Sequence, residues 1–167
     1  QAEYSGTVVF AAPSNTYSSM LICDHNRVRT DVADALSPVA QLTIGGSWVA
    51  DALLDLNGFD QTVGGLKTDG LKTNPGYLAV TSTVPATLTV DQGANTVFVG
   101  ALDGAVSLTK KGAGTLTFSN IISQTTGDLL VASGTVAVAE IGGFAQCRNV
   151  RIAGGTFELR NSTALPD

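Results

Sequence analysis

One stretch of the sequence, residues 24–31, holds the residue types that most often do chemistry. It reads Asp-His-Asn-Arg-Val-Arg-Thr-Asp and contains the single histidine of the chain and two of its nine basic residues. Arg27 and Arg29 could bind a carbohydrate or a protein ligand, because a guanidinium donates hydrogen bonds in a fixed fork. The alternative is a solvated outer strand whose arginines pair with aspartates nearby. The candidate ligand-binding residues here are Asp24, His25, Arg27 and Arg29.

The same stretch does not require an enzyme. A polysaccharide lyase would need a basic residue and usually a calcium ion held by carboxylates, and a glycosidase would need two carboxyls at a set separation. Asp24, Asp31 and Asp34, together with Arg27, could be arranged in either way, but no spacing in the sequence demands it. A serine hydrolase is disfavoured because His25 is the only imidazole and no G-x-S-x-G is present. We expect no catalytic residues.

Asp55, Asn57 and Asp60 loosely resemble a calcium loop. They lack the terminal Glu of an EF-hand and the G-G-x-G-x-D nonapeptide of calcium-binding β-rolls. An Asn-Gly turn between two strands explains the segment instead. The sequence therefore predicts no metal site and no cofactor.

Three further side chains could contact a ligand. Trp48 could stack on a sugar ring or could cover the core. Lys67 and Lys72 lie in two successive phrases, Leu-Lys-Thr-Asp-Gly and Leu-Lys-Thr-Asn-Pro-Gly, which are typical of a loop that projects from the fold. The two lysines could touch a partner there, or they could simply be solvated.

Charge and composition exclude several classes of protein. The chain has 167 residues, enough for one domain, and a formal net charge of −5. An acidic chain without a basic cluster offers no electrostatic footprint for nucleic acid, so we expect no nucleic-acid partner. With 44% hydrophobic and 14% charged residues, the chain should fold, and no apolar run approaches the roughly 20 residues that span a bilayer. We expect a signal peptide to be either absent or already removed.

Short runs of Val, Leu, Ile, Thr and Phe alternate with turn residues along the chain. Apolar residues recur at i and i+2 in these runs, which predicts strands and an all-β fold. The predicted strands are Thr7–Phe10, Leu42–Ile44, Leu53–Leu56, Tyr77–Val80, Thr87–Val90, Thr96–Val99, Gly114–Phe118, Thr135–Val138 and Thr156–Leu159. The best helical candidate, residues 32–36, is short and equally compatible with a turn.

The sequence also matches itself at a long offset. Residues 6–46 align without a gap with residues 114–154, and glycine, threonine and apolar positions coincide. A repeat made of several very short strands predicts a solenoid in which each coil stacks on the next. At about 4.8 Å per coil and roughly 20 residues per coil, Cys23 and Cys147 would lie several coils apart. We therefore expect no disulfide between them and predict two small buried hydrophobes.

One motif carries a family resemblance. Residues 108–119, Leu-Thr-Lys-Lys-Gly-Ala-Gly-Thr-Leu-Thr-Phe-Ser, resemble the autotransporter-associated beta-strand repeat, L-T-K-x-G-x-G-T-L-T-L-S. Residues 124–128 and 133–136 are similar to the turn and the x-G-T-L segment that follow in this family. Residues 54–66 and 154–167 also resemble its phrases, so the resemblance covers most of the chain. It implies a right-handed, single-stranded parallel β-helix of the kind found in passenger regions of exported or surface-displayed bacterial proteins.

The physics of the motif agrees with this fold. Gly112 and Gly114 allow turn conformations that a side chain would hinder. Leu116 and Phe118 can point inward while the threonines beside them face solvent. Residues 164–167, Ala-Leu-Pro-Asp, match the beginning of the family phrase A-L-P-D-G, and the family pattern normally continues past that phrase into another strand. We therefore expect residues 1–167 to be a single β-helix segment of a longer solenoid.

These observations favour a non-enzymatic structural and adhesive passenger segment of an exported bacterial protein. It would lie at the cell surface, in the outer membrane fraction or in the medium. A host or matrix glycan, a surface protein, or a further solenoid that associates end to end could be its partner. The alternative is a secreted β-helix that binds or cleaves polysaccharide.

Overall fold

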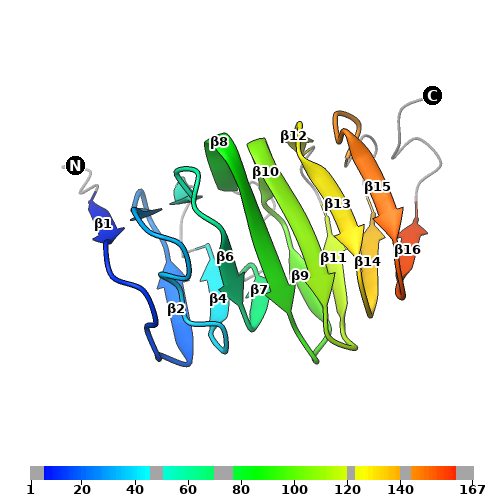
Figure 1. The fold of residues 1–167 in the computed structure, drawn as a ribbon, viewed down its shortest axis with the longest axis horizontal. Helices are drawn as coiled ribbons and strands as arrows, with labels where there is room; N and C mark the ends of the chain where they lie inside the picture. Colours follow the sequence, from blue (N-terminus) through cyan, green and yellow to red (C-terminus); the bar gives the residue numbers. More distant parts are fainter. Residues whose placement is uncertain (1–5, 46–50, 70–76, 120–122, 140–143, 161–167) are drawn as a thin grey trace.

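The chain winds into stacked coils. The computed structural model describes residues 6–45, 51–69, 77–119, 123–139 and 144–160. In these residues the regular structure is all strand, the paired strands are parallel, and the coils form a β-solenoid of about 6 turns. Figure 1 shows the coils side by side along the long axis, with β1 (Thr7–Phe10) at one end of the molecule and β16 (Thr156–Leu159) at the other. The predicted all-β parallel β-helix is confirmed, and its right-handedness stays a prediction.

Three sheets make the faces of the solenoid. The first runs in the order β1 (Thr7–Phe10), β3 (Arg27–Thr30), β5 (Ala52–Asp55), β8 (Leu78–Asp91), β10 (Ala101–Lys111), β13 (Asp128–Val131) and β15 (Asn149–Ile152), with β6 (Gln61–Val63) on β8 and β12 (Gln124–Thr125) on β10. The second contains β9 (Thr96–Phe98), β11 (Thr115–Phe118), β14 (Thr135–Val138) and β16 (Thr156–Leu159). The third contains β2 (Ser19–Ile22), β4 (Gln41–Ile44) and β7 (Gly65–Lys67). The N–H of Thr68, just after β7, donates to Val97 O of β9 at 2.9 Å, so the second and third sheets continue one another.

Strand pairing gives the length of one coil. Gly6 and Asn26, in neighbouring coils, are 20 residues apart, and Thr30 and Leu56 are 26 apart. The offset between residues 6–46 and 114–154 places β1, of the first sheet, on β11, of the second. That offset therefore aligns strands of one face with strands of the other, and the repeat in space is the single coil.

The interior is filled by apolar side chains that stack from coil to coil. Leu88, Leu108 and Leu129 occupy one ladder position of β8, β10 and β13, and all are at most 1% exposed. Leu116 and Phe118 are buried as predicted. Thr117 was predicted to face solvent but is only 9% exposed, because β11 lies between β9 and β14 and is shielded by both.

A lysine is also buried in this interior. Lys110 has no exposed surface, and its Nζ donates to the main-chain oxygens of Lys111 and Gly112, the latter at 3.0 Å. Burial lowers the pKa of Lys110, and the negative charge of Asp91 partly opposes this shift. The Lys110 ammonium therefore stabilises the turn after β10 through hydrogen bonds from the interior of the solenoid.

Turns follow the predicted chemistry. Asn57 and Gly58 have φ angles of 49° and 84°, and Phe59 N donates to Leu56 O at 2.8 Å, which confirms the predicted Asn-Gly turn. Residues 32–36 contain no helix; Asp34 there has a φ of 53°.

The two cysteines do not bond to each other. Both are free thiols, as predicted. The prediction that both are buried is wrong, because each is only half-buried: Cys23 follows β2 in a turn and Cys147 lies in the segment before β15. The Sγ of Cys147 donates to Gly127 O and Asn149 O, each at 3.2 Å.

Candidate functional site

The stretch 24–31 forms a turn followed by an outer strand. Asp24 and His25 take left-handed φ angles of 49° and 64° in the turn. In β3, Val28 and Thr30 are buried and Arg27 and Arg29 are exposed, because successive side chains of a strand point to opposite faces. The alternation thus puts both arginines on the outside of the solenoid.

Arg29 forms an ion pair with Asp31, the residue that follows β3. Its Nε and Nη2 donate to Asp31 Oδ1 and Oδ2 at 2.8 and 2.9 Å. Asn57 Nδ2, from the next coil, also donates to Asp31 Oδ1 at 3.0 Å. The Arg29 guanidinium holds the pKa of Asp31 below its usual range. The interpretation of a solvated strand with a paired arginine therefore describes Arg29.

Arg27 has a different setting. Together with His25, Gly6, Thr7 and Asp51 it lines an open hollow of about 430 Å³. The Asp51 main-chain oxygen accepts from His25 N at 2.7 Å, and Asp51 Oδ1 accepts from Tyr77 N at 2.7 Å. The structure therefore brings Arg27 and His25 together beside the Asp51 carboxylate, which already accepts a hydrogen bond from the main chain of Tyr77.

Asp24 faces the thiol of Cys23 rather than a ligand site. Its Oδ1 atom is buried and has no hydrogen-bond partner in the described residues. Burial, with the Asp24 charge added, raises the pKa of the Cys23 thiol. Asp24 thus does not complete a pair of carboxyls with Asp31, which is occupied by Arg29.

The other predicted contact residues lie elsewhere. Lys67 ends β7, in a sheet that does not include β3, so the structure does not bring Lys67 to the arginines. The beginning of the predicted projecting loop is wrong: Leu66 is fully buried in β7, where it pairs with Leu42. Residues 70–76 of that loop lie outside the described residues. Trp48 and Lys72 lie outside the described residues.

In the segment that resembles a calcium loop, the Asp55 and Asp60 carboxylates accept hydrogen bonds from main-chain N–H groups. Asp55 Oδ1 accepts from Asn57 N at 2.9 Å, and Asp60 Oδ1 accepts from Thr87 N at 2.7 Å. In the part of the chain that the structure describes, no three His, Cys, Asp or Glu side chains gather as a metal site would require.

One carboxyl has a raised pKa. Burial raises the pKa of Asp103, although a hydrogen bond from Gln124 N to its Oδ1 at 3.1 Å opposes the shift. Its ladder neighbours are Thr81 and Gln124, so the adjacent strands offer no second carboxyl at this position. The next carboxyl on this ladder is Asp55 of β5, two strands from Asp103 and beyond Thr81, and its Oδ1 already accepts from Asn57 N.

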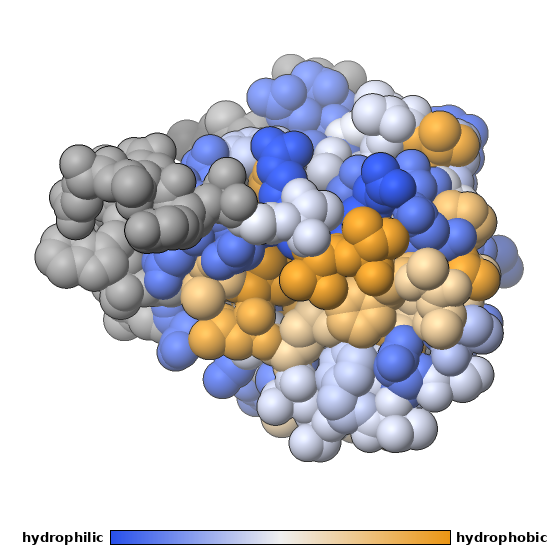
Figure 2. All heavy atoms as spheres, turned by 90° about the vertical axis from the view of Figure 1, so that its left-hand side faces the viewer, coloured by the Kyte–Doolittle hydropathy of each residue, from blue (hydrophilic) through white to orange (hydrophobic). Residues whose placement is uncertain are grey.

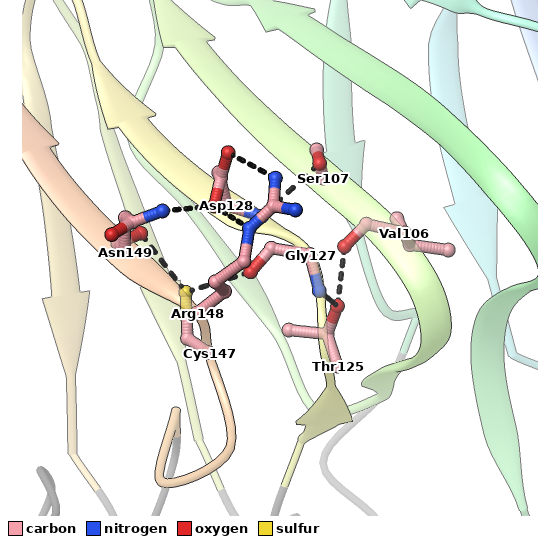
Figure 3. Close-up of polar contacts among 8 residues, drawn as sticks. All are labelled: Val106, Ser107, Thr125, Gly127, Asp128, Cys147, Arg148 and Asn149. Carbon is pink, nitrogen blue, oxygen red and sulfur yellow. Dashed lines mark hydrogen bonds and ion pairs between the residues drawn. The ribbon is translucent and has the colours of Figure 1, made fainter.

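A second polar cluster was missed by the sequence analysis and is drawn in Figure 3. Arg148 Nε and Nη2 donate to Asp128 Oδ1 and Oδ2 at 2.9 and 2.7 Å, and Asn149 Nδ2 donates to Asp128 Oδ1 at 2.8 Å. Asp128 N in turn donates to Ser107 Oγ at 3.1 Å. Asp128 and Arg148 are 20 residues apart, which is one coil. A scan for opposite charges at the coil spacing would have found this pair.

These contacts lower the pKa of Asp128 to about 2, mainly through the hydrogen bonds from Arg148 and Asn149. In an Arg148→Gln variant we expect this pKa to rise toward its ordinary value of 3.8, stopping short because Asn149 remains. Because the folded-state pKa is depressed, the carboxylate stabilises the fold above 3.8, and this contribution is lost as the pH falls through about 2. Titration of the Asp128 side-chain carbon by NMR measures the shift. An unchanged pKa in the variant would contradict the assignment.

Among the described residues, no helix is long and apolar enough to cross a membrane. Comparison of the chain with protein-family models, with curated proteins and with solved structures found no match.

Proposed function

We propose that this chain is a non-enzymatic β-helical segment of an exported bacterial surface protein, in which it acts as a stiff spacer that presents adhesive surfaces. The observation that carries the proposal is the unbroken parallel pairing from β1 to β15. Each coil is held to the next by main-chain hydrogen bonds on more than one face, so bending the stack would break several ladders together.

The two ends of the stack support this role. Figure 2 looks onto the end that carries β1 and shows apolar residues gathered there; Val8, Val9 and Leu21 are about half exposed. At the other end Val150, Ile152 and Leu159 are exposed. The ladder partners of these side chains in the next coil inward are buried, except that of Val9, which is the exposed Arg29. Such end surfaces favour contact with further coils, from the same protein or from another copy.

The charged groups support a structural rather than a chemical role. Arg29, Arg148 and Arg160 each pair with a carboxylate on the outside of the solenoid. The resemblance of residues 108–119 to the autotransporter-associated repeat supports display at the cell surface.

Location tests the proposal. Antibody against this chain is expected to label intact cells of the source organism, and brief protease treatment of those cells should remove the signal. The antigen should fractionate with the outer membrane or appear in the medium. A cytoplasmic marker that survives the protease is the control for intact cells. Antigen found only in the cytoplasm, and protected there, would overturn the proposal.

A further inference from the structure

Strand register gathers outward side chains from four neighbouring strands of the first sheet. Thr87 of β8 pairs with Ser107 of β10, and Asp128 of β13, bonded to Ser107, pairs with Asn149 of β15. A second row lies two residues further along the same strands. It consists of Thr109, Leu130 and Arg151.

These two rows line an open groove of about 590 Å³. Small-molecule sites usually measure roughly 300–1,000 Å³, so the groove has room for a ligand of a few rings. Neighbouring strands are about 4.8 Å apart. A ligand that lies across the strands would therefore meet a new polar side chain at each strand.

The polar groups of the groove are partly fixed and partly free. Asp128 is held by Arg148 and Asn149, and its charge is balanced by Arg148. Ser107 Oγ accepts from Asp128 N, which leaves its O–H free to donate. The described residues provide no hydrogen-bond partner for the hydroxyls of Thr87 and Thr109. The groove thus offers several hydroxyls and an oriented carboxylate to a ligand.

The groove also carries one unbalanced positive charge. Arg151 is exposed and lies in the second row, and in the described part of the chain it forms no ion pair. Arg148 is already used by Asp128. A ligand of this groove should therefore bring one negative charge to Arg151 and several hydroxyls to the remaining side chains.

We propose that this groove binds an acidic saccharide. Arg151 pairs with the carboxylate of the sugar, and the Ser107, Thr109 and Asp128 side chains bond with its ring hydroxyls. Leu130 contacts the apolar face of the ring. A peptide strand fits less well, because the main-chain groups of β10 and β13 that it would need are already paired within the sheet. The site does not depend on the proposed role as a spacer.

NMR titration of the ¹⁵N-labelled 167-residue chain tests the proposal. The probes are tetragalacturonate and a hyaluronan tetrasaccharide, added in parallel. At least one is expected to shift the amides of residues 107–109, 128–130 and 149–151. Fully methyl-esterified tetragalacturonate keeps the hydroxyls and loses the charge. If tetragalacturonate binds, its ester should bind roughly tenfold more weakly, since a hydrogen bond to a charged group contributes about 1.5–3 kcal/mol.

Matched variants locate the binding. Arg151→Gln should weaken binding of the acidic probe roughly tenfold, and Thr109→Val should weaken it by a smaller factor. Arg160→Gln makes the same change of charge beside β16, on the other face, and should bind as the parent does. The amide spectrum away from the groove confirms that each variant is folded.

Three results would overturn the proposal: no shift at the groove with either probe, equal affinity for tetragalacturonate and its ester, or equal loss in Arg151→Gln and Arg160→Gln. None of them bears on where the protein lies in the cell, so the site and the proposed function fail separately.

Discussion

Replacing Gly112 with alanine is expected to destabilise the solenoid by roughly 3 kcal/mol. Gly112 has a φ of 73°, in the left-handed region, and a Cβ there would lie 2.3 Å from Gln92 O in the preceding coil. Gln92 cannot move away cheaply, because its N–H donates to Lys111 O at 3.2 Å and its oxygen accepts from Gly114 N at 3.0 Å. The strain would therefore be shared by two coils. Urea unfolding measures the loss.

Gly93 supplies the matched control. A Cβ at Gly93 meets no atom within 4 Å, and its φ lies outside the left-handed region. Gly93→Ala should therefore change the stability by no more than about 0.5 kcal/mol. Similar unfolding midpoints for the two variants would contradict the argument, whereas a Gly112→Ala chain that fails to fold would agree with it.

The glycine turn shows what a local pattern can predict. Gly112 was singled out from its motif, and β1, β14 and β16 have the predicted bounds, each a short run with apolar residues at i and i+2. β8 was expected as two strands, Tyr77–Val80 and Thr87–Val90, but it is one strand from Leu78 to Asp91. Residues 81–86, Thr-Ser-Thr-Val-Pro-Ala, include a proline, and a proline within a run argues against a continuous strand. They are held by the neighbouring strand β10, with a register shift between Gly104 and Val106.

The polar contacts also fall into two groups: those that the local sequence predicts and those that depend on how the coils stack. The pair of Arg29 and Asp31 was among the expected pairings, since residues two apart on a strand share a face. The pair of Asp128 and Arg148 is 20 residues apart; the offset between residues 6–46 and 114–154 does not give this spacing, whereas the coil length of roughly 20 residues typical of solenoids does. The groove at Arg151 depends on the register of four strands and could not be derived before that register was known.

The second large effect is expected at Phe118, the centre of a ladder of aromatic rings inside the solenoid. Phe118 is 2% exposed, and its ring meets those of Phe98 and Phe144 edge to face, with centroids 5.9 and 5.0 Å apart. Phe118→Ala should cost about 3–5 kcal/mol, because it opens a cavity between coils and removes two aromatic contacts. Val97→Ala, at an exposed position of the adjacent strand β9, should cost no more than about 0.5 kcal/mol.

The consequence should also depend on the position in the stack. In a solenoid, stability is approximately a sum of terms within each coil and between neighbouring coils. Loss of Phe118 weakens the joint between the coils before and after β11 and leaves the coils of β3 and β5 in place. Hydrogen exchange should therefore accelerate at β11 and β14 and change little at β3 and β5. Uniform acceleration along the chain would instead show that the coils unfold as one cooperative unit, since damage to one joint would then release them all.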